Sequence, residues 1–143
     1  MSSAETIRAA RVRSFIQLAR EELAVSADLM QAHRRQSAYF LQQAVEKALR
    51  GVLEVEGIAA GPMHSIRGLS DLLPKDHPMR ERFIELEPLS SASTRYRYPT
   101  ANGTLMDIGE KHLRELKLLA DAVIAEAIVI METYLEGPAE SGL

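Results

Sequence analysis

Apolar residues that recur at intervals of three and four restrict the possible folds of this chain more than any other feature. One such series lies between residues 5 and 31 and defines a single helix face: Val12, Phe15, Ile16, Ala19, Leu23, Ala27 and Met30. A second series leads to Gly57, a typical helix stop, and predicts a helix that ends near Glu56. At about 1.5 Å per residue, two helices of about 20 to 25 residues form a long antiparallel hairpin.

The remaining periodic segments predict three further helices. Ser65 can cap a short third helix, and Pro78 suits the first position of a fourth helix that Pro88 bends or ends. The last predicted helix runs from about Asp107, its cap, to Leu135. Because no segment alternates like a strand, we predict an all-α fold. The expected architecture is an up-and-down bundle of about five helices, with the antiparallel hairpin beside a long C-terminal helix.

Length and composition indicate one folded unit. The chain has 143 residues, of which 46% are hydrophobic and 26% are charged, close to the averages for globular proteins. We predict a single domain over residues 1–136 and a flexible tail over residues 137–143. The absence of cysteine excludes disulfides and thiolate metal sites, and it fits a cytoplasmic location.

Two classes of partner are disfavoured by the charge pattern. The most apolar stretch, from Leu118 to Met131, contains Asp121 and Glu126 and falls short of the roughly 20 residues that a bilayer span needs. We therefore expect no membrane segment. The net charge of −3 provides no broad basic surface for nucleic acid, so any contact with a polynucleotide must be local.

The last helix is apolar on almost every side between Ala122 and Met131. Ile124, Ile128 and Val129 lie off its main apolar face, which a surface helix does not require. We predict that these side chains are buried in a homodimer. The alternative is a central helix that is covered by its own chain.

The longest segment without helical periodicity, residues 90–104, is predicted to be an ordered loop. It contains Arg95, Tyr96, Arg97, Tyr98 and Pro99 in succession. Guanidinium groups can hold phosphate oxygens in pairs, and phenol rings can stack on a base, so this pattern predicts a site for nucleotides or RNA phosphate. The alternative is that the rings pack on the bundle while the arginines pair with surface acids such as Glu85 or Glu87.

The second helix also carries polar residues, opposite its apolar face: Gln42, Gln43, Glu46, Lys47 and Arg50. We interpret them as a solvated face. The functional alternative is that Gln43 and Lys47, one turn apart, face the loop with Arg97 and complete an anion site.

The histidines are the remaining candidates for chemistry. His64, just before the third helix, is either structural or a ligand-binding residue. The other three histidines lack partners at metal-ligand spacing, so we predict no metal and no cofactor.

Three motifs together resemble the HEPN domain family. They are the helix at residues 39–50, the run Met63-His64-Ser65-Ile66, and Arg97-Tyr98-Pro99, in that order. The similarity covers about residues 12–135 and is typical of small prokaryotic HEPN-domain proteins. It implies a bundle of about five helices that is often dimeric, is proposed to bind nucleotides or RNA, and frequently works with a small nucleotidyltransferase.

One feature of the wider HEPN superfamily is missing. Its ribonucleases have an arginine followed by four to six residues and then histidine, and none of the four histidines here has arginine at that spacing. We therefore predict a non-catalytic nucleotide- or RNA-binding module, as the partner subunit of a nucleotidyltransferase in a toxin–antitoxin-like pair. The alternatives are a metal-independent ribonuclease or toxin and a purely structural dimeric protein. The predicted site residues are Arg95, Arg97, Tyr96, Tyr98, Lys47, Gln43 and His64.

Overall fold

The computed structural model describes residues 2–137 and confirms the all-α class, with no strand in that range. Its elements are α1 (Ser3–Leu29), α2 (Arg34–Val55), α3 (Ile66–Ser70), α4 (Arg80–Ile84), the 3₁₀ helix η1 (Glu87–Ser93) and α5 (Glu110–Leu135). Of the tail predicted at residues 137–143, residues 138–143 lie outside the described residues. The three long helices are the ones that the periodicity predicts.

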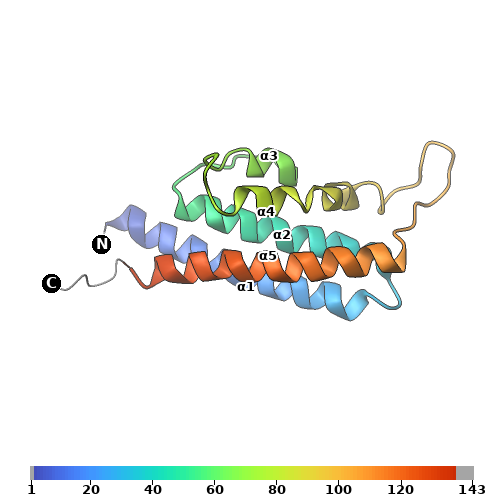
Figure 1. The fold of residues 1–143 in the computed structure, drawn as a ribbon, viewed down its shortest axis with the longest axis horizontal. Helices are drawn as coiled ribbons and strands as arrows, with labels where there is room; N and C mark the ends of the chain where they lie inside the picture. Colours follow the sequence, from blue (N-terminus) through green and yellow to red (C-terminus); the bar gives the residue numbers. More distant parts are fainter. Residues whose placement is uncertain (1, 138–143) are drawn as a thin grey trace.

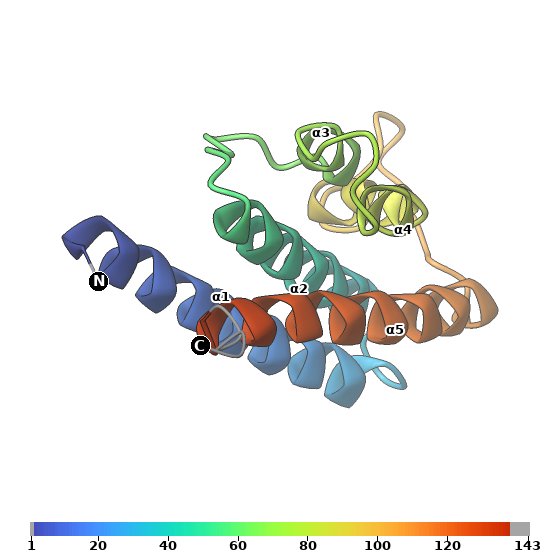
Figure 2. The same cartoon turned by 60° about the vertical axis from the view of Figure 1, so that its left-hand side comes forward.

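Helix α2 is the central element of the bundle. α1 and α5 pack on one side of it, and α3, α4 and η1 cover the other, as Figures 1 and 2 show. α1 and α2 form the expected antiparallel hairpin. α1 begins and α5 ends at the same end of the molecule, whereas the segment between η1 and α5 lies at the opposite end (Figure 1). We call this segment, residues 94–109, the loop.

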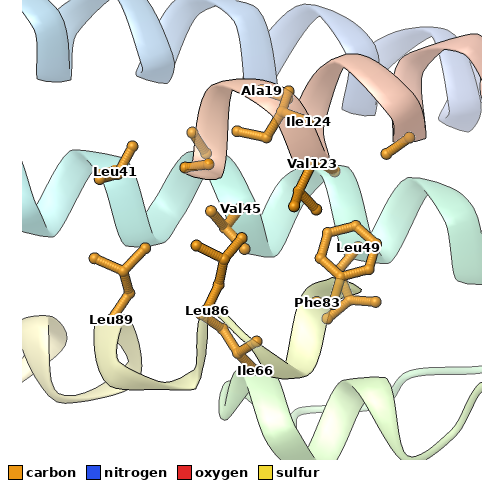
Figure 3. Packing of buried hydrophobic residues seen from close by; sticks show 14 of the residues in the cluster. Ala19, Leu41, Val45, Leu49, Ile66, Phe83, Leu86, Leu89, Val123 and Ile124 are labelled. Atoms are coloured by element: carbon orange, nitrogen blue, oxygen red, sulfur yellow. The ribbon is translucent and has the colours of Figure 1, made fainter. Parts of the chain in front are cut away.

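The core forms where α2 lies between α5 and the segment that contains α3, α4 and η1 (Figure 3). Val45 and Leu49 of α2 are fully buried, as are Phe83, Leu86 and Val123 from the flanking elements. Full burial of one such side chain stabilises a fold by about 1.5–3 kcal/mol. Packing against α2 therefore holds the short helices in place, since five-residue helices are not stable alone.

The all-round apolar stretch of α5 is explained mainly by burial within the chain. Ile124 is 1% exposed and Ile128 is 8% exposed, so the alternative interpretation holds for these two residues. Val129 is 62% exposed and Leu118 is 72% exposed. On α5, the apolar surface left for a partner is this outer stripe, and the homodimer stays a prediction.

Two predicted helix boundaries are confirmed by their hydrogen bonds. The hydroxyl of Ser65 accepts a bond from the backbone N–H of Gly68 at 3.1 Å, which caps α3. At the end of α2, Gly57 has a φ of 71°. Its N–H donates to the Glu54 carbonyl at 3.1 Å, and the Ile58 N–H donates to the Leu53 carbonyl at 2.9 Å. This pair of bonds is the Schellman motif, which requires the left-handed conformation that glycine adopts at low cost.

Two other local predictions were wrong. Residues 90–93 belong to the 3₁₀ helix η1 rather than to a loop, because Pro88 lies in its first turn instead of ending a helix. Asp107 does not cap α5, which has Gly109 at its N-cap position. Its carboxylate instead accepts a hydrogen bond from the Arg34 guanidinium at 2.8 Å. The side chain of Asp107, which the local sequence predicted to be a helix cap, thus forms a tertiary ion pair instead.

Polar contacts fix the helices relative to one another. In the hairpin, the hydroxyls of Ser26 and Ser37 each donate to the other residue's carbonyl, at 2.8 and 2.7 Å, and both serines are buried. Between α4 and α5, Arg82 donates to Glu126 through Nε and Nη2, with the shortest bond at 2.7 Å. This hydrogen bonding to the carboxylate raises the pKa of the Arg82 guanidinium.

Candidate functional site

The loop begins as a set of tight turns that place its aromatic and basic side chains. The backbone N–H groups of Arg97 and Tyr98 both donate to the Thr94 carbonyl, at 3.1 and 3.2 Å. Further on, the N–H of Thr100 donates to the Thr104 carbonyl at 2.8 Å, and the turn between them contains Gly103 with a φ of 81°. The prediction of an ordered loop is therefore confirmed for this part.

Arg97 lies on aromatic rings from two segments. Its Cζ atom is 4.6 Å from the centre of the Tyr39 ring and 5.5 Å from the centre of the Tyr98 ring. Tyr39 belongs to α2, where its ring meets that of Phe40 edge to face at 5.3 Å. These cation–π contacts hold the guanidinium of Arg97 beside the two rings.

A hollow of about 300 Å³ opens beside this stack, between the loop and the first turns of α2. Its lining consists of Arg35, Gln36, Tyr39, Phe40, Tyr96, Arg97 and Leu105. The volume is at the lower end of the range for small-ligand sites, and the lining combines aromatic walls with a few polar groups. This combination suits a ligand in which a planar ring is joined to a negatively charged group.

Sequence analysis missed the half of this site that α2 contributes. Arg35 and Gln36 are not among the predicted site residues, although two adjacent arginines before an aromatic pair were a usable signal. The structure separates the roles of the two arginines. Arg34 donates to Asp107 and, through Nε at 3.1 Å, to the Ile108 carbonyl. Arg35 lines the hollow, and no described residue pairs with its guanidinium.

The predicted loop residues do not all face the same way. Arg95 and Tyr98 line a neighbouring hollow of about 520 Å³, whereas Tyr96 and Arg97 line the first one. Tyr96 is half-buried and packs against the core, so part of the structural alternative holds for it. Tyr98 is 57% exposed.

The glutamates named as structural partners for the loop arginines have other contacts. Glu85 pairs with Arg82 at 3.7 Å, and Glu87 accepts a hydrogen bond from the Ser90 hydroxyl at 3.1 Å. Arg95 is exposed, and its guanidinium has no partner among residues 2–137.

Lys47 contacts α1, and Gln43 contacts Lys47, so the two residues do not form part of the hollow. The ammonium of Lys47 donates to Glu22 at 2.9 Å and to the Gln43 side chain at 3.2 Å. Gln43 in turn donates to the Gln42 side chain at 2.7 Å. Neither residue lines the hollow that contains Arg97.

His64 belongs to a third, separate cluster. Its Nδ1 atom lies 3.3 Å from a carboxylate oxygen of Glu46, which is 4% exposed. Glu46 also accepts from Arg50 at 3.2 Å, and Arg50 holds the carbonyls of Gly61 and Met63. The segment before α3 therefore passes over this side of α2. Because of that cover, the solvated-face interpretation was wrong for Glu46. It was also wrong for Gln42, which is 1% exposed.

Two properties of the described range bear on the chemistry. Between residues 2 and 137, no three histidine, aspartate or glutamate side chains lie close enough together to hold a metal ion. Within the same range, none of the helices combines the length and apolarity needed to cross a bilayer.

Comparison with known proteins identifies the family. The family model described as the HEPN domain matches residues 12–136. The crystal structure of an archaeal HEPN homologue superposes with a TM-score of 0.59 at 19% identity, covering 84% of this chain and 97% of that one. No curated protein sequence matches the chain. Since the family model spans most of the sequence and the fold agrees, the chain belongs to the HEPN domain family.

Proposed function

We propose that this HEPN domain is a non-catalytic module that binds a nucleotide or a nucleotide unit of RNA in the hollow beside Arg97. The observation that carries the proposal is the stack of Arg97 on Tyr39, at 4.6 Å, at the edge of a hollow that Arg35 and Tyr96 also line. Cationic edges and aromatic faces at one place match the two halves of a nucleotide.

Each half of the ligand has a chemical counterpart. Phosphate oxygens accept from the edges of Arg35 and Arg97, which approach from α2 and from the loop. A base lies against the rings of Tyr39 or Tyr96, where stacking contributes about 1–3 kcal/mol per base. Arg95, exposed beside Tyr98 in the adjoining hollow, extends the basic surface for a following phosphate of a single strand.

We propose binding rather than catalysis because the ionisable side chains that line the hollow are those of tyrosine and arginine alone. Neither histidine nor a carboxylate lines it, and ribonuclease chemistry needs a general base or acid within hydrogen-bond reach. The absence of the Arg-x₄₋₆-His spacing supports the same choice. Cleavage of a short single-stranded RNA by the purified protein would contradict it.

The test is calorimetric titration of the parent protein and of Arg97→Ala with nucleoside mono-, di- and triphosphates and a short single-stranded RNA. Arg13→Ala is the matched control, because Arg13 is an exposed arginine of α1 outside the hollow. We expect binding by the parent and the control, and about tenfold or greater weakening in Arg97→Ala. If the parent binds nothing in this panel, or Arg97→Ala binds equally well, the proposal fails.

A partner protein is also proposed, on the family resemblance alone. A small nucleotidyltransferase encoded by the neighbouring gene would be the expected partner in a toxin–antitoxin-like pair. Co-expression of the two chains and co-elution in size-exclusion chromatography tests this part separately from ligand binding.

A further inference from the structure

A second basic hollow, of about 460 Å³, lies between the first half of α1, the end of α2 and the connection at residues 57–61. The start of α1 and the loop are at opposite ends of the bundle (Figure 1), so this hollow is separate from the proposed nucleotide site. Three arginines line it: Arg8, Arg11 and Arg50. None of them was a candidate in the sequence.

Arg8 and Arg11 approach the hollow from the same face of α1, since residues three apart are neighbours on a helix surface. Arg11 is held at two points. Its Nε atom lies 3.1 Å from the Glu54 carboxylate, and its Cζ atom lies 5.5 Å from the centre of the Phe15 ring. These contacts orient the guanidinium, while its two terminal nitrogens have no acceptor among the described residues.

Arg8 lies against the backbone at Gly57. A Cβ atom added there would be 3.3 Å from the Nη2 atom of Arg8, and the φ of Gly57 is 71°. Glycine thus permits both the turn and the close approach of the guanidinium. No described carboxylate pairs with Arg8.

Arg50 forms the rigid wall of the hollow. Its side chain is 16% exposed and is fixed by the Glu46 carboxylate and by the carbonyls of Gly61 and Met63. Glu54 pairs with Arg11 and Glu46 pairs with Arg50, whereas no described carboxylate pairs with Arg8, so one of the three positive charges is left without a counterion. The electrostatic balance therefore favours an anion.

We propose that this hollow binds a small phosphorylated molecule, with its phosphate between Arg8 and Arg11. Arginine forks match the geometry of phosphate oxygens. The half-buried side chains of Phe15 and Ile58 line the same hollow and provide an apolar wall for the rest of the ligand. The ligand class is thus an organic phosphate with an apolar or aromatic part.

The test uses the Arg97→Ala protein as background, so that the loop site does not contribute. Phenyl phosphate and inorganic phosphate are titrated into it by calorimetry. We expect phenyl phosphate to bind more tightly than inorganic phosphate because of the apolar wall. In that background, Arg8→Ala with Arg11→Ala should weaken the binding of phenyl phosphate by about tenfold to a hundredfold.

The matched control is Arg13→Ala with Arg20→Ala, which removes two exposed arginines of the same helix that line a different hollow. This control protein should bind phenyl phosphate as tightly as the Arg97→Ala background does. Ala59→Glu, at an exposed position in the lining, introduces a carboxylate and should also abolish binding without touching an arginine. Melting curves verify that each variant folds.

Three results would overturn this assignment: no binding of phenyl phosphate, equal binding after the Arg8 and Arg11 changes, or an equal loss in the control. None of them bears on the loop site, which is measured with Arg97 intact.

Discussion

The guanidinium of Arg97 lies over the ring of Tyr39, with 4.6 Å between Cζ and the ring centre. This contact joins the loop to the first turns of α2 and creates one side of the candidate nucleotide site. Neither residue is buried, so the pair contributes little to the core.

Replacing Arg97 by lysine should restore only part of the affinity that alanine removes. We expect Arg97→Ala to cost about 1–3 kcal/mol of nucleotide binding, the range for charge-assisted hydrogen bonds. Lysine keeps the charge but lacks the planar fork and its stack on Tyr39. Titration of both variants with the same nucleotide checks this order. Equal affinities of Arg97→Lys and the parent would show that charge alone matters.

Tyr39 should act through its ring and not through its hydroxyl. Tyr39→Leu removes the aromatic face and is expected to weaken nucleotide binding by about 1–3 kcal/mol, the value for base stacking. Tyr39→Phe keeps the ring and is the matched control, with affinity near that of the parent. A similar loss in both variants would contradict a stacking role and indicate a hydrogen bond instead.

Glu46 should be important for stability. It is 4% exposed and accepts from Arg50 and Gln42, at 3.2 and 3.3 Å. Glu46→Ala leaves Arg50 without its counterion, and we expect a loss of about 3 kcal/mol in the free energy of unfolding. Chemical denaturation measures it. Glu115→Ala, at an exposed position of α5, serves as control and should change stability by less than about 0.5 kcal/mol.

Substitutions at two adjacent residues of α5 test stability and dimerisation separately. Ile128 is buried by its own chain, so Ile128→Glu should destabilise the folded monomer and is a poor test of dimerisation. Val129 is 62% exposed, and Val129→Glu should leave the melting temperature almost unchanged. If the predicted homodimer uses the outer stripe of α5, Val129→Glu will shift the parent dimer to monomer in sedimentation equilibrium. A parent protein that is monomeric at tens of micromolar would rule the homodimer out.

Gly57 tests the backbone at the end of α2. Its φ of 71° is costly for any residue with a Cβ atom, so Gly57→Ala should destabilise the protein by about 1–2 kcal/mol. Gly109 has a φ of −59°, and a Cβ atom there meets nothing within 4 Å. Gly109→Ala is therefore the control, and it should have a much smaller effect in thermal unfolding.

Spacing of apolar residues by itself determined the helical class, the hairpin and the long last helix. This was possible because a helix needs one continuous apolar face to pack, and that face repeats in the sequence at a fixed period. Local stop and cap signals, Gly57 and Ser65, were also readable, since their hydrogen bonds run to residues only a few positions away. Likewise, the order of the three motifs was enough to indicate the family before any fold was known.

Tertiary structure alone decided which polar residues come together. Arg35 joins Tyr96 and Arg97 only because the loop folds back on the start of α2, and Arg8 meets Arg50 only because α1 and α2 are antiparallel. Asp107 was predicted to be a cap because sequence patterns indicate only nearby partners. Its actual partner, Arg34, lies 73 positions earlier in the sequence. Contacts between polar side chains that are far apart in the sequence leave no periodic pattern. Both candidate sites could therefore be found only from the way the helices pack.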